Sequence, residues 1–344
     1  MSSRPRARTA RPPKGQTRRA SIFLPALIAA GILGLGLAQG AYFGRGPTAR
    51  DGAATDVMLR PGLGAWGVAG ALHDAGVIRS PIMFLAAAKL TGAAPELKAG
   101  EYLFPSQASL ARVIDAMRKG EVVRHTVTIP EGVTSRAVAE ILTRSPDLTG
   151  AAPVAAEGAL LPETYDVRKG EARAKVVQQM ADARDALLAD LWQARRPGLP
   201  YRTPEDAVVL ASIVERETGK PDERRLVAAV FVNRLAKGMR LESDPTVVYG
   251  LTGGVPLGHG LRVSELQSRT PYNTYLVAGL PPTPIANPGR ASLVAALDPA
   301  PTNDLYFVAD GTGGHVFTDN YETHLKNVAR WRAVEPLKAA GTAS

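Results

Sequence analysis

Between 56 and 120 the chain alternates between short strand-like runs and helical patterns of apolar residues. In order, the strand-like and helical runs are VMLRPG (strand), AWGVAGALHDAGVI and SPIMFLAAAKL (helices), AGEYLF (strand) and SLARVIDAMRKG (helix). Ser80 and Ser109 precede two of these helices as N-cap residues, and Pro81 and Gly120 are typical of a helix start and a helix end. The pattern predicts a small α+β module over 56–120.

A larger α+β pattern covers 121–335. VRHTVTIPEG alternates as a strand, SRAVAEILTRS has helical spacing, and 174–194 predicts one long helix. Further helices are predicted over 204–217, 222–237 and SLVAALDP. LESDPTVVYG predicts a turn and a strand, and LYFVADGTGGHVFT predicts a β-hairpin. Residues 336–344 are left as a C-terminal tail.

The helix predicted to end at Glu217 has a strong start signal and an apolar stripe. Thr203, Pro204 and Asp206 combine an N-cap, a first-turn proline and a capping-box acid. The apolar positions that share one face, at i, i+3, i+4 and i+7, are Ala207, Leu210, Ala211 and Val214. Glu217 continues this stripe, whereas Glu215 lies about 200° round the helix. The pattern therefore favours Glu217 over Glu215 as the buried carboxylate.

Glu217 is a candidate proton donor because of its position. In the last turn of a helix its carboxylate meets the negative end of the helix dipole, and its surroundings are partly apolar. Both effects raise the pKa of a carboxyl group. An acid that stays protonated near neutral pH is the main requirement for cleaving a glycosidic bond. A carboxylate at a helix end is, however, more often capped, solvated or ion-paired, with Arg216 or Arg224 as available partners.

Positive charge is concentrated at the N-terminus. Of the net charge of +9, seven units lie within residues 1–19, which leaves only +2 beyond residue 19. The next segment, Ala20 to Gly44, has no charged residue and is long enough to cross a bilayer. We therefore expect a cytoplasmic basic tail (1–19), a single transmembrane helix (20–44) and a short stalk (45–55). A cleaved signal peptide is the alternative.

Several kinds of chemistry lack their residues in this chain. Without cysteine there are no disulfides or thiol nucleophiles, and the five histidines have no HExxH or clustered spacing, so we expect no metal site. GxSxG, P-loop and SxxK patterns are missing, and no cofactor is expected. Aromatic residues are sparse and are not interleaved with basic ones, which argues against nucleic acid as a partner.

Five segments occur in an order and spacing that resemble one family. They are EGALLPETY, LASIVERET, VFVNRL-x-x-GM-x-L-x-S-DPTVVYG, PYNTY-x-x-x-GLPPTPIANPG and LYFVADGTGGHVFT. Together they resemble the MltG/YceG family of membrane-anchored endolytic murein transglycosylases. The resemblance implies an α+β fold, in which a LysM-like module (56–120) follows the transmembrane helix and precedes a mixed α+β YceG-like catalytic domain (121–335). Leu161, Glu163 and Glu242 depart from the residues usual at their positions.

The resemblance also implies an activity. The second glutamate of the E-x-E-T segment, Glu217, is implied as the catalytic residue that cleaves the bond between N-acetylmuramic acid and N-acetylglucosamine in nascent glycan strands. The products would carry 1,6-anhydro ends and would end strand elongation. The candidate sugar-binding residues are Asn233, Tyr249, Asn273, Tyr275, His315 and Glu163. Peptidoglycan is the implied substrate and penicillin-binding synthases are candidate partners. The expected location is the inner membrane, with the catalytic domain in the periplasm.

Two other classes stay open at this point. A glycan-binding scaffold of the wall-synthesis machinery would keep the same segments without cleaving glycan. A chorismate-processing lyase would require a pyridoxal-phosphate lysine in a cytoplasmic enzyme. An exported chain without a recognisable cofactor motif argues against the lyase.

Overall fold

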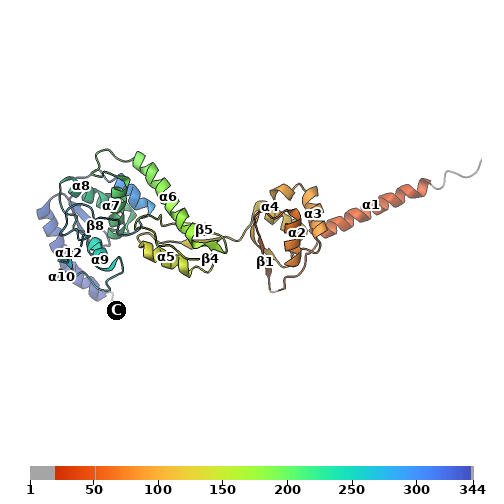
Figure 1. Cartoon of the computed structure of the whole chain (residues 1–344), viewed down its shortest axis with the longest axis horizontal. Coiled ribbons are helices and arrows are strands. Elements are labelled where there is room, and N and C mark those ends of the chain that lie inside the picture. Colours follow the sequence, from red (N-terminus) through yellow and green to blue (C-terminus); the bar gives the residue numbers. More distant parts are fainter. Residues whose placement is uncertain (1–19, 51, 342–344) are drawn as a thin grey trace, which may run out of the picture. The chain divides into compact units, whose positions relative to one another are not determined.

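A computed structural model describes residues 20–50 and 52–341 of the chain (Figure 1). The chain separates into two compact units, the first ending at Val123 and the second beginning at Arg124. Both combine helices with two-stranded sheets, which agrees with the α+β class expected from the sequence. The basic tail expected over 1–19 lies outside the described residues.

The first unit contains one antiparallel strand pair and helices that close a core over it. The strands are β1 (Ala54–Leu59) and β2 (Gly100–Pro105), with Ala54 opposite Pro105 and Leu59 opposite Gly100. The helices are α2 (Ala65–Asp74), α3 (Pro81–Leu90), η1 (Ala94–Glu96) and α4 (Leu110–Lys119). Ser80 and Ser109 accept hydrogen bonds from the backbone of the first turns of α3 and α4, so these two predicted starts are confirmed. That this unit is a LysM-like module stays a prediction.

The segment expected to cross the membrane forms helix α1 (Ala20–Phe43). Within 20–50 and 52–341, no helix has the length and apolar character needed to span a bilayer. The side chains of 20–26, at the start of α1, lie outside the described residues.

Over 124–341, the described part of the second unit, the strands form three separate pairs. β3 (His125–Thr128) pairs antiparallel with β5 (Thr164–Val167), β4 (Leu148–Thr149) pairs parallel with β6 (Glu171–Ala172), and β7 (Tyr306–Ala309) pairs antiparallel with β8 (His315–Thr318). The helices are α5 (Ser135–Arg144), α6 (Arg173–Gln193), α7 (Pro204–Glu217), η2 (Pro221–Glu223), α8 (Arg224–Ala236), α9 (Asp244–Thr252), α10 (Val263–Leu266), α11 (Arg290–Leu297) and α12 (Tyr321–Gly341). The predicted C-terminal hairpin is confirmed as β7–β8.

Helix α7 lies at the centre of the main core of the second unit. Every residue from Ala207 to Val214 is buried, and α7 packs against α6, α8, α9 and α11. The expectation of a single apolar stripe is therefore wrong, because neighbours enclose this helix on more than one side. Its predicted start is confirmed: Thr203 and Asp206 form the capping box.

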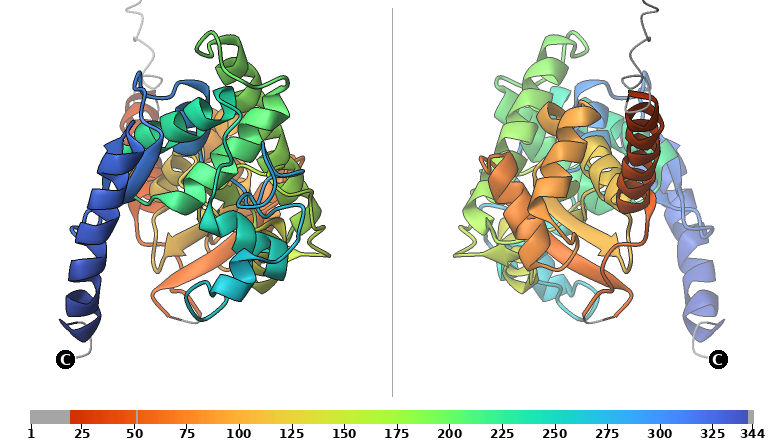
Figure 2. Two further views of the ribbon diagram at one scale, coloured as in Figure 1. Left: turned by 90° about the vertical axis from the view of Figure 1, so that its left-hand side faces the viewer. Right: turned by 90° about the vertical axis from the view of Figure 1, so that its right-hand side faces the viewer.

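Two further expectations are corrected. The strand predicted for DPTVVYG is helix α9, in which Pro245 occupies the first turn after Ser243 and Thr246 donates back to the Ser243 carbonyl at 2.6 Å. A proline at this position suits a helix start, and tertiary packing outweighs the β-propensity of the two valines. Helix α12 had no counterpart in the predicted pattern, and it continues through 336–341 of the expected tail; in Figure 2 it is the dark blue helix at the edge of the second unit.

Candidate active site

The carboxylate of Glu217 lies at the end of α7, where Thr218 leaves the helical conformation as the C-cap. Its Oε1 accepts a hydrogen bond from the Ser243 hydroxyl at 2.5 Å. Protein surrounds the carboxylate, yet the residue as a whole is only half-buried, so one side stays open to solvent. This combination allows a carboxyl group to be desolvated and still to reach a ligand.

The surroundings of Glu217 favour its protonated form. The pKa of Glu217 is raised to about 7, mainly by burial and to a smaller extent by the nearby Asp244 carboxylate. The Ser243 hydrogen bond and the positive charge of Arg234 act in the opposite direction, but burial dominates. A substantial fraction of Glu217 is therefore protonated near neutral pH, as the sequence predicted, and burial is the largest cause.

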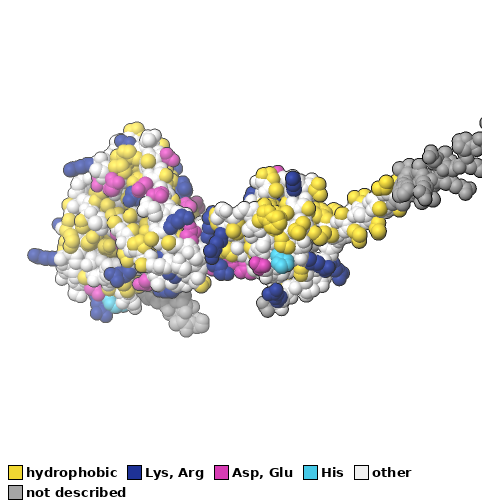
Figure 3. Space-filling model, turned by 45° about the vertical axis from the view of Figure 1, so that its right-hand side comes forward, with side chains coloured by type: hydrophobic (Ala, Val, Ile, Leu, Met, Phe, Trp, Pro, Cys, Tyr) yellow, Lys and Arg dark blue, Asp and Glu magenta, His cyan; other side chains and the backbone are white. Residues whose placement is uncertain are grey.

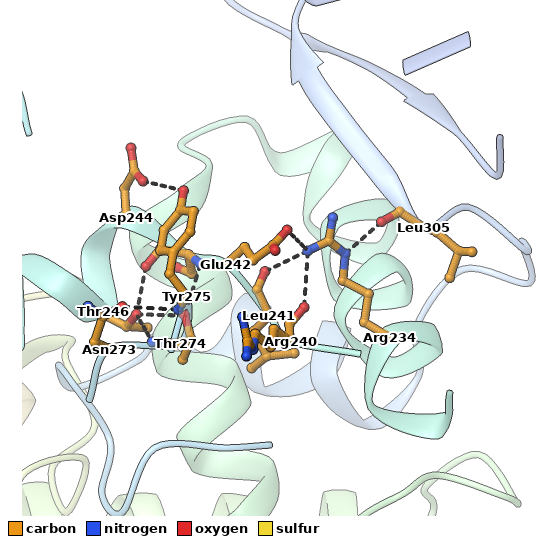
Figure 4. Close-up of polar contacts among 11 residues, drawn as sticks. Arg234, Arg240, Leu241, Glu242, Asp244, Thr246, Asn273, Thr274, Tyr275 and Leu305 are labelled. Carbon is orange, nitrogen blue, oxygen red and sulfur yellow. Dashed lines mark hydrogen bonds and ion pairs between the residues drawn. The ribbon is translucent and has the colours of Figure 1, made fainter. Parts of the chain in front are cut away.

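A buried hydroxyl network holds Ser243 in place. The Ser243 N–H donates to Thr274 Oγ1 at 3.0 Å, and the hydroxyls of Thr246 and Thr274 lie 2.8 Å apart. Ser243, Thr246 and Thr274 are all buried, and Figure 4 shows Thr246 and Thr274 side by side. Because these buried side chains cannot exchange their hydrogen bonds for bonds to water, the Ser243 hydroxyl keeps its orientation toward Glu217.

Arg234, near the end of α8, fixes the backbone just before Ser243 (Figure 4). Its guanidinium donates to the carbonyls of Arg240, Leu241 and Leu305 at 2.7 to 3.1 Å, and it pairs with Glu242 at 3.1 Å. Glu242 has φ of 54°, in the left-handed region that is uncommon for residues other than glycine. A non-glycine residue in that region needs support from its surroundings, and Arg234 supplies it.

Asp244 stands on the other side of Ser243, at the start of α9. Its Oδ1 accepts from the Tyr275 hydroxyl at 2.7 Å (Figure 4). Burial and this hydrogen bond both raise the pKa of the Tyr275 phenol, so Tyr275 stays protonated and acts as a donor. The aspartate itself is exposed.

A cleft of about 370 Å³ opens at the end of α7, and Glu217 is not one of the residues that line it. Its walls include Arg216, which precedes Glu217, and Asp244, which follows Ser243. Tyr249 and His259 also line it. The cleft thus brings together the end of α7, helix α9 and the loop after α9.

Glu157 is a residue of this cleft region that sequence reasoning missed as a candidate. Its Oε1 accepts from the backbone N–H of Ser135 at 2.8 Å and from the Asn287 amide at 3.3 Å, and its Oε2 accepts from the Tyr249 hydroxyl at 3.3 Å. Burial raises the pKa of Glu157. Glu157 therefore fixes the direction of Tyr249, an aromatic wall of the cleft.

Glu215 has a different environment from Glu217. Its carboxylate is 5% exposed and lies 3.3 Å from the Arg224 guanidinium, which is 12% exposed. Its other oxygen accepts from the Gly289 N–H at 2.9 Å. A Cβ at Gly289 would overlap the Glu131 carboxylate, which would have to move to admit a side chain. The sequence favoured Glu217 as the buried carboxylate, but the Glu215 carboxylate is buried as well.

The other candidate residues are divided between the cleft and supporting positions. The Asn233 amide donates to the carbonyls of Thr302 and Asp304, and the Asn273 amide donates to those of Leu266 and Ser268, with Asn273 having no exposed surface. His315 Nδ1 lies 2.7 Å from Glu223 Oε2.

Glu163 is exposed, and its carboxylate lies 3.6 Å from the Arg290 guanidinium. Across the described ranges no group of three or more His, Asp or Glu side chains could hold a metal ion.

Comparison with known proteins gives a consistent picture. The model of the YceG-like family matches residues 57–330. The endolytic murein transglycosylase of Streptococcus pneumoniae serotype 2 (strain D39) is 27% identical over 305 residues, which cover 75% of this chain and 55% of the relative. The Bacillus subtilis protein of the same name is 43% identical over 121 residues, or 35% of this chain and 32% of the relative. The chain spans about half the length of the S. pneumoniae relative.

A solved structure is also similar. A yceG-like protein from Listeria monocytogenes superposes with a TM-score of 0.50 at 28% identity, covering 79% of this chain and 98% of the Listeria chain.

Proposed function

Because the chain belongs to the YceG-like family, we propose that it is an endolytic murein transglycosylase in which Glu217 is the proton donor. Its relatives from S. pneumoniae and B. subtilis bear that name. The observation that carries the proposal is the Glu217 carboxyl, whose pKa is about 7 and whose chain neighbour Arg216 lines an open cleft. Its substrate would be the glycan strand of peptidoglycan, cut within the strand.

In the reaction, Glu217 transfers its proton to the glycosidic oxygen between N-acetylmuramic acid and N-acetylglucosamine. The C1–O bond breaks, and positive charge develops at C1 of the muramoyl sugar. The C6 hydroxyl of the same sugar then attacks C1, and its proton returns to the Glu217 carboxylate. One glycosidic bond is replaced by a 1,6-anhydro bond, and no water is consumed.

Internal attack explains how a single carboxylate can suffice. The nucleophile belongs to the substrate and is already next to C1, so the enzyme need not activate a water molecule. Glu215 is bound to Arg224 and Gly289 and has no free oxygen for such a role. Ser243 holds the Glu217 carboxylate in one orientation during both proton transfers.

The candidate sugar-binding residues take different roles in this proposal. Tyr249 lines the cleft and offers an aromatic face to a sugar ring, and Tyr275 is held beside the site by Asp244. Asn233 and Asn273 act indirectly, because both amides bind backbone carbonyls. In this proposal, His315 and Glu163 bind sugars of the glycan strand that lie farther from the cleaved bond.

The anchor, the LysM-like module and the synthase partners also belong to the proposal. The uncharged segment 20–44 would hold the chain in the inner membrane, with the second unit in the periplasm. Such an enzyme would act on glycan close to the membrane, where penicillin-binding synthases extend new strands.

The test is the product profile of the full chain on purified, uncrosslinked glycan. Glu217→Gln should reduce anhydro-ended products by about 10²- to 10⁴-fold, because the amide cannot donate the required proton. Glu215→Gln is the matched control and should stay within a few-fold of the wild type per folded molecule. Mass spectrometry of the released muropeptides separates the outcomes.

Each alternative result has a definite meaning. Anhydro ends that persist in Glu217→Gln would show that another group is the acid. Reducing ends in place of anhydro ends would make the enzyme a hydrolase, with Asp244 as the available second carboxylate. Glycan binding without any product would leave the scaffold function.

A further inference from the structure

Helix α3 of the first unit is apolar on the side that faces solvent as well as on the side that faces the core. Its sequence, PIMFLAAAKL, has Lys89 as its one charged residue. Phe84 is fully buried, whereas Ile82 is 69% and Leu90 is 87% exposed. A helix that is apolar all round is normally enclosed, either by protein or by lipid. Within the described residues, nothing covers the Leu90 side.

The exposed side of α3 continues into the surface of α1. A groove of about 300 Å³ has Met83 and Leu90 on one wall and Tyr42 and Phe43, from the end of α1, on the other. Most large apolar side chains of α1 after residue 26 are themselves exposed. Figure 3 shows this as hydrophobic side chains that gather on the first unit next to α1. The apolar surface of α3 is thus an extension of the apolar surface of the helix that precedes it.

Basic side chains border this surface. A second hollow of about 230 Å³ shares Met83 with the groove and is lined by Arg45 and Arg79. The Arg79 guanidinium donates to the Arg45 carbonyl at 3.2 Å, which holds it at the end of α1. Lys89 adds a third cation, and no acidic residue among those described lines either hollow. An apolar surface with a cationic border is typical of segments that lie in the interface of an anionic bilayer.

We propose that the exposed side of α3, together with its basic border, lies in the headgroup layer of an anionic membrane. This inference rests on the membrane anchor proposed above and is independent of the glycan chemistry. The N-terminal tail is a poor occupant of the groove, because its seven basic residues match neither the apolar walls nor the basic border. With α3 in the headgroup layer, the first unit has a fixed orientation on the membrane surface.

The test uses single cysteines in the full chain, which has none of its own. Leu90→Cys carries an environment-sensitive fluorophore, and the protein is reconstituted into vesicles of equal parts phosphatidylethanolamine and phosphatidylglycerol. Leu103→Cys, on β2, is the matched control, because Leu103 is also a well-exposed leucine of the first unit (58%) but does not line the groove. Lipids with a nitroxide near the headgroup report contact. The label at Leu90 should lose about half of its emission or more, and the label at Leu103 should lose little.

Vesicle flotation separates the two proposals. Protein that fails to float with the vesicles overturns the anchor, and this inference with it. Protein that floats with an unquenched Leu90 label overturns only the inference about α3. A blue shift at Leu90 that depends on protein density, without quenching by lipid, would assign the surface to a second copy of the chain instead. Equal quenching at Leu90 and Leu103 would also contradict a specific α3 contact.

Discussion

Glu215 and Glu217 both lie in the last turn of α7, but their surroundings differ. Glu215 packs against a guanidinium, whereas Glu217, two residues later, contacts a hydroxyl, and Arg216 between them lines the open cleft. Arg224 lies 3.3 Å from Glu215 and the Gly289 N–H donates to its other oxygen. Glu217 receives one hydrogen bond, from Ser243. Both carboxylates are removed from bulk water, but only Glu215 has a positive partner within ion-pair distance.

The comparison shows that burial alone does not produce a proton donor. A buried carboxylate beside a buried cation is held in its charged form, because the attraction offsets the lost hydration. A buried carboxylate with only a neutral donor is shifted toward its protonated form, and the pKa of Glu217 rises to about 7. Two glutamates on one helix end thereby acquire a structural and a chemical role.

The largest expected effect is on stability at Glu217. Its pKa is about 7 in the folded protein and 4.5 in the unfolded chain. Below pH 4.5 both states bind the proton and nothing is lost. As the pH rises from 4.5 to 7, the unfolded state ionises first, so the wild type loses stability, by about 3 kcal/mol at and above pH 7. Glu217→Gln does not titrate and should therefore be more stable than the wild type by about that amount at pH 8, and equal to it near pH 4.

Thermal unfolding of the wild type and of Glu217→Gln across this pH range measures the difference in their stability. The other titrating groups are the same in both proteins, so their contributions cancel in this difference. Glu215→Gln is the control, because it removes a carboxylate from the same helix end and leaves Glu217 in place. A Glu217→Gln advantage that is constant with pH would contradict the raised pKa.

At Glu215 the expected effect has the opposite sign. In Glu215→Gln the buried Arg224 guanidinium loses one of its two carboxylate partners. It keeps only Glu131, at 3.4 Å. Losing one partner of a buried ion pair destabilises a protein by several kcal/mol, and the remaining Glu131 contact reduces this to about 2 kcal/mol. Thermal unfolding at pH 7 should show it, while activity per folded molecule is retained. Adding Arg224→Met removes the buried cation and should recover part of the loss. An inactive but fully stable Glu215→Gln would reverse the two roles.

Local signals in the sequence predicted the start and end of α7 well. The Thr203–Asp206 capping box and the break after Glu217 depend on neighbours along the chain, and both occur as expected. The assignment of burial failed for Glu215, because helical phase describes a helix with one covered side and α7 is enclosed. The ion pair between Glu215 and Arg224 depends on how α7 and α8 pack, so it could not be predicted from the sequence position of either residue.

Long-range contacts and local propensity account for what was missed. Glu157 binds groups that are 22, 92 and 130 residues away in the chain, namely Ser135, Tyr249 and Asn287, so no local pattern marks it. In α9, the Asp-Pro pair and two valines are typical of a turn and a strand. The segment is nevertheless helical, because the buried hydrogen bonds of Thr246 with Ser243 and Thr274 stabilise the helical conformation.

A smaller effect is expected from Ser243→Ala. The Ser243 hydroxyl stabilises the ionised form of Glu217, so its removal should raise the pKa of Glu217 further. A hydrogen bond to a charged group contributes about 1.5 kcal/mol, which corresponds to roughly one pH unit. The alkaline limb of kcat/KM should therefore move to higher pH, because Glu217 must begin the reaction protonated. A limb that moves to lower pH would contradict the direction of this hydrogen bond's effect.

The smallest expected effect comes from Asp244→Asn, and it has the opposite direction. The Asp244 charge raises the pKa of Glu217, so a neutral amide should lower it and move the alkaline limb of kcat/KM to lower pH. Asp244 is exposed, and solvent weakens its influence to a few tenths of a pH unit. The amide oxygen can still accept from Tyr275, which limits the change to charge. Raising the ionic strength should narrow the gap between Asp244→Asn and the wild type but leave the Ser243→Ala shift in place, because salt screens an exposed charge and does not replace a buried hydrogen bond. A gap that is insensitive to salt would mean that Asp244 acts through Tyr275 rather than through its charge.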